Sequence, residues 1–156
     1  MTNGRKQTIE STFRKSAAGS VSAEAAIGAV AVALAVAAMA VDHLIPGDAP
    51  AFLITSTISL AVAAVIFGHV IPRTKAGPAA PVLAAKRGML FSGVAVLSIP
   101  TLFVGLPFVL GSAGVALGLL GREGERRPLA FAALALGALV VLFSVGVYVV
   151  LGDSGG

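Results

Sequence analysis

The two histidines of this chain stand in similar surroundings, and imidazoles are among the side chains best suited to metal binding and to proton transfer near neutral pH. The stretch LAVAAMAVDHLIP (34–46) aligns with LAVAAVIFGHVIP (60–72) at an offset of 26 residues. His43 and His69 occupy the same position in it, each three residues before a proline. A shared metal site would require both side chains to lie about 2 Å from one ion.

The segments that carry these histidines are strongly apolar. The 156 residues are 57% hydrophobic and 12% charged, whereas a soluble domain has about 25% charged residues. The charges cluster and leave uncharged stretches at 25–41, 49–72, 88–121 and 128–152. Since a helix needs about 20 mainly apolar residues to cross a bilayer, we predict an all-α integral membrane protein, a helical bundle of four to five hydrophobic segments.

The third stretch, 88–121, is too long for one crossing. Its 34 residues would form a helix of about 50 Å, against about 30 Å of hydrocarbon. Proline removes a backbone hydrogen bond and glycine permits a turn. We therefore predict that this segment is broken or hairpin-like at Gly105 and Pro107, with Pro100 as a further break. A re-entrant pair of half-helices is the alternative form of the same break.

Residues 1–24 contain few sizeable apolar side chains, so we expect a polar and disordered cytoplasmic tail there. The start of the chain, with Ala38-Met39-Ala40, resembles a secretory signal peptide. Its apolar run exceeds the usual length of about 7–15 residues, so we expect this segment to be retained as a span. We expect a transmembrane domain over 25–152, a short tail over 153–156, and spans at about 25–44, 51–71, 88–104, 107–121 and 129–151.

Orientation follows from the lysines and arginines, which favour the cytoplasmic side of a membrane. Four precede the first span, none lies at 42–50, and four lie at 73–87. If the third stretch turns back, all eleven lie on the cytoplasmic side, whereas a single crossing would leave three outside. We predict five crossings, with the N-terminus cytoplasmic and the C-terminus outside, and four crossings as the alternative. The bases after the first span, which also suit anionic lipid headgroups, are Arg73, Lys75, Lys86, Arg87, Arg122, Arg126 and Arg127.

This orientation answers the question that the histidines raise. The first span runs outward and ends near His43, and the second runs inward and ends near His69. The two side chains then lie about 30 Å apart across the bilayer, so they do not form one site. We expect each imidazole to support a helix C-terminus. The alternative is a pH-sensing role, or a metal held together with Asp42 and Asp48 in an oligomer.

The sequence predicts no catalytic, cofactor or metal site. Asp42, His43 and His69 lie at the edges of the predicted spans, and the polar residues of the span interiors are mainly serines and threonines. A serine without a basic partner is a poor nucleophile, and such hydroxyls usually bond helical carbonyls or neighbouring helices. The chain also lacks cysteine and a GxxxxGK loop. Because the bases flank the spans, we expect no nucleic-acid partner, and we expect a protein that is not an enzyme.

Small residues, by contrast, are organised along the spans. Helices associate in lipid by close backbone approach, which glycine and alanine allow. Alanine recurs at every fourth position of the first span, and small residues four apart occur in the fourth and fifth. We expect these surfaces to pack spans together, within one chain or between copies. They are Ala25, Ala29, Ala33 and Ala37 in the first span, Gly114 and Gly118 in the fourth, and Ala133 and Gly137 in the fifth.

The second half of the chain, from LPFVLGSAGVALGLLG through REGERR to the last span, resembles small uncharacterised polytopic membrane proteins of high-GC Gram-positive bacteria. The pattern is an apolar run broken by proline and glycine, an LGLLG-like end, a short arginine-rich turn and a span of Ala, Gly and Leu. It covers about residues 100–152. The resemblance implies a bacterial plasma membrane.

These features together predict a non-catalytic membrane protein. We expect an accessory, scaffold or immunity-type subunit that lies in the lipid bilayer and packs against another membrane protein or against itself. The alternative is a small oligomeric transporter or channel that uses the broken third segment, since discontinuous helices bind substrates in transporters. A water-accessible path would distinguish transport from packing.

A reporter that is active only in the cytoplasm is expected to be inactive when it is fused after Gly156, because the charge distribution places the C-terminus outside. The same reporter inserted after Gly77, in the basic loop, is expected to be active and serves as the control. Activity of the fusion after Gly156 would mean that the chain crosses the membrane four times.

Overall fold

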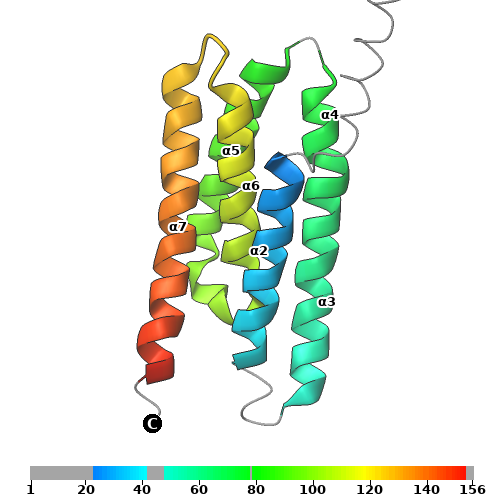
Figure 1. Ribbon diagram of the computed structural model, residues 1–156, viewed down its shortest axis with the longest axis vertical. Helices are drawn as coiled ribbons and strands as arrows, with labels where there is room; N and C mark the ends of the chain where they lie inside the picture. The colour runs from blue at the N-terminus through cyan, green and yellow to red at the C-terminus, as the bar shows by residue number, and fades with distance from the viewer. Residues whose placement is uncertain (1–22, 42–47, 78, 154–156) are drawn as a thin grey trace, which may run out of the picture.

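The computed structural model describes residues 23–41, 48–77 and 79–153, and this part of the chain is a bundle of helices without strands. It confirms the predicted all-α bundle and the break in the third stretch. If the continuous stretch Ala49–Lys75 is taken as one helix, successive long helices alternate in direction along the bundle (Figure 1). The elements are α2 (Ala23–Met39), α3 (Ala49–Val65), the π-helix η2 (Ile66–Val70), α4 (Ile71–Lys75), α5 (Ala80–Leu97), the 3₁₀-helix η3 (Ile99–Val104), α6 (Leu106–Gly121) and α7 (Arg127–Asp153).

Three helical stretches in the described part of the chain are long and apolar enough to cross a membrane. They are Ala49–Lys75, Ala80–Leu97 and Arg127–Val150. Two shorter apolar helices, Ala23–Met39 and Leu106–Gly121, pack with them. The five apolar helices correspond in order to the five hydrophobic segments that the sequence predicts.

The boundaries of the third predicted span differ from the structure. The sequence predicts a span at 88–104, whereas α5 covers Ala80–Leu97 and is followed by η3. The helix begins earlier, at Ala80, and has Pro81 in its first turn, where the missing N–H of proline costs no helical hydrogen bond. It ends earlier because Pro100 has no N–H to continue the helix and disfavours helical geometry in the residue before it.

The helices α3 and α4 form one long helix that is interrupted by η2. Pro72 lacks the N–H that the carbonyl of Gly68 would receive in a regular α-helix. The chain widens by one residue at this point, and the N–H of Ile71 bonds the carbonyl of Ile66, five residues back. The widened turn allows the helix to continue past the proline to Lys75.

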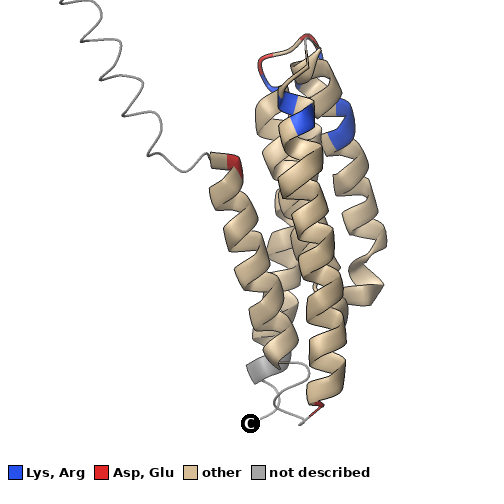
Figure 2. Cartoon of the chain, turned by 90° about the vertical axis from the view of Figure 1, so that its right-hand side faces the viewer, with Lys and Arg blue, Asp and Glu red and all other residues tan. Residues whose placement is uncertain are grey.

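The charges distinguish the two ends of the bundle. Figure 2 shows the lysines and arginines gathered at one end, where α2 and α5 begin and where α4 and α6 end. We call this the charged end. At the opposite end, the Asp48 carboxylate caps α3 by accepting a hydrogen bond from the Ala51 N–H at 3.2 Å. All described bases therefore lie at the charged end, as the hairpin form of the third stretch requires.

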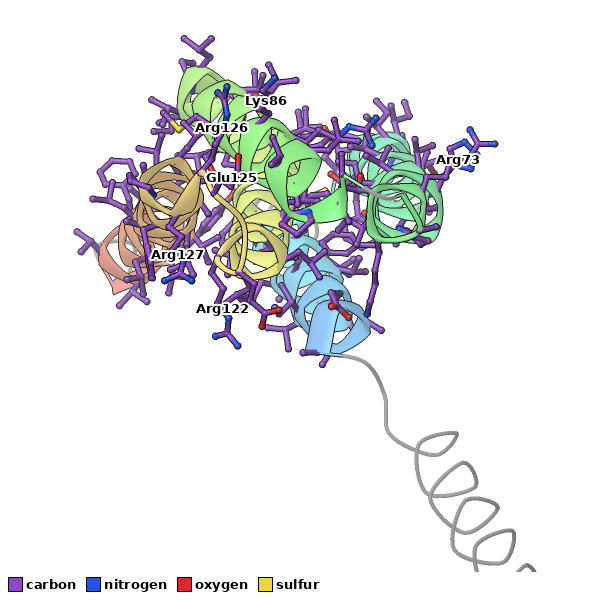
Figure 3. All side chains as sticks on the ribbon, turned by 90° about the horizontal axis from the view of Figure 1, so that it is seen from above. Arg73, Lys86, Arg122, Glu125, Arg126 and Arg127 are labelled. Atoms are coloured by element: carbon purple, nitrogen blue, oxygen red, sulfur yellow. The ribbon has the colours of Figure 1, made fainter. Side chains whose placement is uncertain are left out.

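α6 is the central helix, packed between α5 and α7 and touched by α2 and α3 (Figure 3). Twelve of its sixteen residues are buried. A Cβ atom on Gly118 would lie 2.9 Å from the carbonyl oxygen of Ala130 in α7, and one on Gly114 would overlap the hydroxyl of Ser92 in α5. The two glycines of the predicted GxxxG therefore face two different helices.

Gly118→Ala is expected to lower the free energy of unfolding by about 1–3 kcal/mol, because the added methyl group meets backbone atoms of α7 that cannot move independently. Gly146→Ala, on the same scale, is expected to be neutral or stabilising by up to about 1 kcal/mol, since a Cβ there has no neighbour within 4 Å. Unfolding of the purified protein in mild detergent measures both. Equal stability of the two variants would show that α6 and α7 are not in backbone contact.

Candidate functional site

The turn of the α5–α6 hairpin places backbone carbonyls inside an apolar bundle, where each needs a hydrogen-bond donor. The hydroxyl of Ser59 in α3 donates to the carbonyl of Val104. The hydroxyl of Tyr148 in α7 donates to the carbonyl of Leu102 at 3.0 Å. Gly105 completes the turn with a φ of 71°, which glycine adopts without strain. Two helices distant in sequence therefore stabilise one turn.

This turn lies inside the bundle rather than at its end. Ser59 is ten residues from the start of α3 at Ala49, and Tyr148 is five residues from the end of α7 at Asp153. At 1.5 Å per residue, these positions are about 15 Å and about 7 Å from the helix ends. The hairpin therefore stops short of the ends of α3 and α7.

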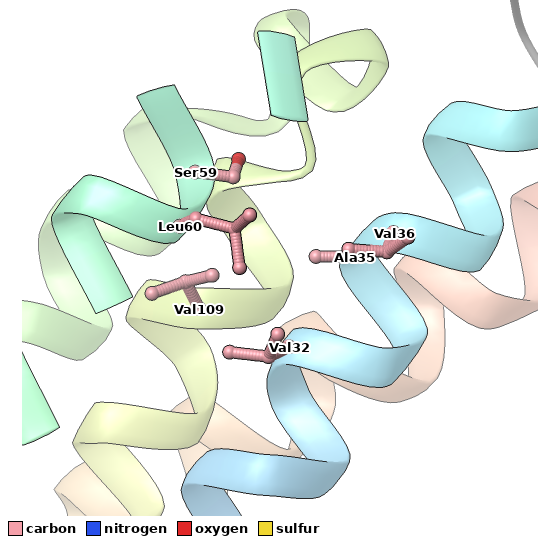
Figure 4. Close-up of a pocket in the computed structure, with 6 residues that line it drawn as sticks. All are labelled: Val32, Ala35, Val36, Ser59, Leu60 and Val109. Atoms are coloured by element: carbon pink, nitrogen blue, oxygen red, sulfur yellow. The ribbon is translucent and has the colours of Figure 1, made fainter. Parts of the chain in front are cut away.

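A narrow gap lies beside Ser59, between α2, α3 and α6 (Figure 4). It has no room for a water-sized sphere. The hydroxyl of Ser59 is the polar group in its wall, and this hydroxyl already donates to Val104. The gap is therefore a packing defect rather than a binding site. Its lining residues are Val32, Ala35, Val36, Ser59, Leu60 and Val109.

The small residues predicted for the fourth and fifth spans come together where α5, α6 and α7 meet. Gly114, Gly118, Ala133 and Gly137 are all buried. The hydroxyl of Ser92 in α5 donates to the Ala133 carbonyl at 2.7 Å, so a polar bond also crosses this contact. Backbone approach and one interhelical hydrogen bond hold the three helices together.

The alanines predicted to form the packing stripe of the first span point away from the bundle. Ala25, Ala29, Ala33 and Ala37 are exposed. α2 packs inward through a different set of small residues, which the sequence reasoning did not select. These are Gly28, Ala31, Ala35 and Ala38.

Two further glycines of α6, Gly111 and Gly121, also contact neighbouring helices and were not selected from the sequence. Gly111 and Gly118 both face α7, and Gly114 and Gly121 both face α5. Each pair is seven residues apart, which returns a helix to nearly the same face after two turns. A search for glycine at this spacing would have found them. Ser59 and Tyr148 carry no comparable signal, because their bonds join segments that the sequence does not relate.

The bases predicted to mark one side of the membrane lie at the charged end. Arg87 donates to the hydroxyl of Thr74 at 2.6 Å, and Thr74 donates to the Val70 carbonyl at 2.7 Å. Lys75 forms an ion pair with Glu24 at 3.3 Å, which joins the end of α4 to the start of α2. The remaining bases are exposed: Arg73, Lys86, Arg122, Arg126 and Arg127.

The histidines are not brought together in the described part of the chain. His69 is exposed in η2, while His43 and Asp42 lie outside the described residues. No group of three or more potential metal ligands occurs among the residues that the structure describes. The metal site with Asp42 and Asp48 stays a prediction.

Comparisons of the chain with models of protein families, with curated proteins and with solved structures found no match.

Ser59→Ala is expected to lower the free energy of unfolding by about 1–3 kcal/mol, because it removes the donor of the half-buried Val104 carbonyl. Tyr148→Phe is expected to lower it less, by about 0.5–1.5 kcal/mol, because the Leu102 carbonyl keeps the hydrogen bond from the Gly105 N–H. Thr57→Val is the matched control, since this exposed hydroxyl bonds the Leu53 carbonyl of its own helix. We expect the control to stay within about 0.5 kcal/mol. Unfolding in mild detergent provides the comparison, and control-like behaviour of both variants would contradict the assigned bonds.

Proposed function

We propose that this chain is a non-catalytic integral membrane protein, an accessory, scaffold or immunity-type subunit that acts by packing against another membrane protein. The observation that carries the proposal is the outer face of α2, where Ala25, Ala29, Ala33 and Ala37 are all exposed. In lipid, a stripe of small residues favours a neighbouring helix, because it lets two backbones approach closely.

The outer faces of the other long helices have a different composition. Among their most exposed side chains are Ile54 on α3, at 63%, Leu90 on α5, at 63%, and Leu142 on α7, at 72%. Such large side chains suit contact with acyl chains. Val30 is the large hydrophobic side chain that α2 exposes beside its alanines, so most of the exposed side chains along this helix are small. This contrast supports α2 as the helix that contacts a partner.

The proposal includes a bacterial plasma membrane and a cytoplasmic charged end. The gathering of every described lysine and arginine at one end supports this orientation, because cytoplasmic segments carry the excess of basic residues. With five alternating helices, the N-terminus would then be cytoplasmic and the C-terminus outside. The exposed bases would lie at the depth of anionic lipid headgroups.

A small oligomeric transporter or channel is the second candidate. The observation that favours it is the hairpin turn, which lies some 7–15 Å inside the ends of α3 and α7 by helix rise. Discontinuous helices at such depths bind substrates in transporters. However, the Leu102 and Val104 carbonyls already accept hydrogen bonds from Tyr148 and Ser59. We therefore rank this function second.

Purification from the native membrane in mild detergent, followed by mass spectrometry, tests the proposal. We expect a larger membrane protein to co-purify in a fixed ratio. Ala29→Leu combined with Ala33→Leu is expected to lose this partner, because bulky side chains prevent close approach. Ala61→Leu combined with Ala64→Leu, at exposed alanines of α3, is expected to retain it.

A homogeneous oligomer of this chain without another protein would contradict the subunit role. Flux measurements in liposomes would then test the transporter. A partner that remains bound to both double variants would support the subunit role but exclude this face of α2 as the contact.

A further inference from the structure

α6 turns most of its surface toward its neighbours. Gly111 and Gly118 face α7, and Gly114 and Gly121 face α5, while Val109 meets α2 and α3. Another face of the helix carries four residues, the first of them Phe108, at successive spacings of four, three and four. Phe108 lies beside residues of both α2 and α7. We call this line of four residues the open face of α6. It consists of Phe108 and Ser112, which side chains of the same chain largely bury, and of Val115 and Leu119, which are half-buried.

Two hollows lie along the open face. Away from the charged end, Phe108 and Tyr148 border a hollow of about 220 Å³ between α2 and α7, whose other walls are aliphatic. At the charged end, Leu119 and Leu120 border a hollow of about 390 Å³ between α6 and the start of α2. Side chains of one neighbouring helix that runs along α6 have room in both.

Ser112 lies on the same line, one turn after Phe108. Its side chain is only 7% exposed, and among the described residues its hydroxyl has no hydrogen-bond partner. A buried hydroxyl without a partner is costly in an apolar interior. Ser112 therefore indicates a hydrogen-bonding group that approaches from outside the chain. The other buried hydroxyls each donate a hydrogen bond: Ser56, Ser59, Thr74, Ser92 and Ser144.

The charged end of the open face is basic. Figure 3 shows the side chains of Arg122 and Arg127 pointing outward on the side of α2 and α7, whereas Arg126 points to the opposite side. Within the part of the chain that the structure describes, neither Arg122 nor Arg127 forms an ion pair. Glu24 borders the hollow there but is paired with Lys75 at 3.3 Å.

Glu123 also borders this hollow, so two arginines face one unpaired carboxylate. The net charge at this end of the open face is positive. It would attract an acidic residue at the end of a docked helix. A second copy in the same orientation would instead bring arginines against arginines, which is unfavourable.

We propose that the open face is the docking surface for one transmembrane helix of a different protein. This inference rests on the proposed subunit function and specifies its partner. The docked helix carries a hydrogen-bonding side chain at the depth of Ser112 and acidic residues at its end beside Arg122 and Arg127. Apolar side chains of the same helix fill the hollow beside Phe108 and Tyr148. Of the α2 stripe, Ala37 borders that hollow, so the docked helix would meet the stripe at this residue.

A synthetic helix provides the probe. It contains about 20 leucine and alanine residues, a central glutamine, two glutamates at one end and a dye at the other. The full chain, which has no natural cysteine, receives the second dye at Val149→Cys beside the hollow or, as a control, at Ile54→Cys on α3. These positions are 65% and 63% exposed. Energy transfer in liposomes is expected to be stronger from Val149→Cys.

The glutamine probe is expected to bind about three- to fifteenfold more tightly than a probe with leucine at that position, as for hydrogen bonds between membrane helices. Ser112→Ala is expected to remove this difference without lowering the stability of the protein alone, because the hydroxyl has no partner to lose. Arg122→Gln with Arg127→Gln is expected to remove the preference for glutamate over lysine at the probe end.

Equal energy transfer from the two labelled positions, or an unchanged glutamine preference in Ser112→Ala, would overturn the proposal. Self-association between labelled copies at Val149→Cys would identify a second copy as the occupant instead. Loss of probe binding in anionic vesicles, but not in neutral ones, would identify an anionic lipid as the occupant of the open face. In native membranes, a co-purifying partner that is unaffected by Ser112→Ala would refute this surface and leave the subunit role intact.

Discussion

Lipid provides no water to a broken helix, and this constraint determines how the bundle is joined. The chain leaves the α-helical pattern between α5 and α6, so the carbonyls of that turn need donors from elsewhere. Ser59 provides one to the Val104 carbonyl, and Tyr148 adds a second donor to the Leu102 carbonyl, which also accepts from the Gly105 N–H. As a result, α3 and α7 are both attached to a turn that is far from them in sequence. The break that interrupts the third segment is also the point at which three segments meet.

Helix packing differs between two parts of the bundle, one formed by α5, α6 and α7 and the other by α2 and α3. α5, α6 and α7 meet through glycine, alanine and serine, and the Ser92 hydroxyl bridges two of them. α2 also packs inward mainly through small residues, but a gap remains among Val32, Leu60 and Val109, where α2, α3 and α6 meet. A partner that docks against α2 and the open face of α6 could therefore bind without disturbing the contacts of α5 with α6 and α7.

The sequence predicts where the helices of this fold lie along the chain better than it predicts which side of each helix packs inward. Uncharged stretches identify the apolar helices, and Gly105 and Pro107 identify the break, because both signals act on the local backbone. The direction of the α2 alanines could not be predicted, since small residues occupy both sides of that helix. The α6 glycines form a repeat of seven as well as a GxxxG, and only the positions of α5 and α7 decide between them. Ser112 resembles any other helical serine until its lack of a partner is seen.

The π-helix η2 has a consequence for the register of the charged end. A π-turn is equivalent to one residue inserted into an α-helix, and one residue corresponds to a rotation of about 100° about the helix axis. The widened turn absorbs this residue, so α4 keeps the orientation that places Thr74 beside Arg87 and Lys75 beside Glu24. If residues 66–70 were wound as a regular α-helix, α4 would rotate by about 100° relative to α3 and both contacts would be lost. The widened turn therefore sets the angular position of the end of α4 on the bundle.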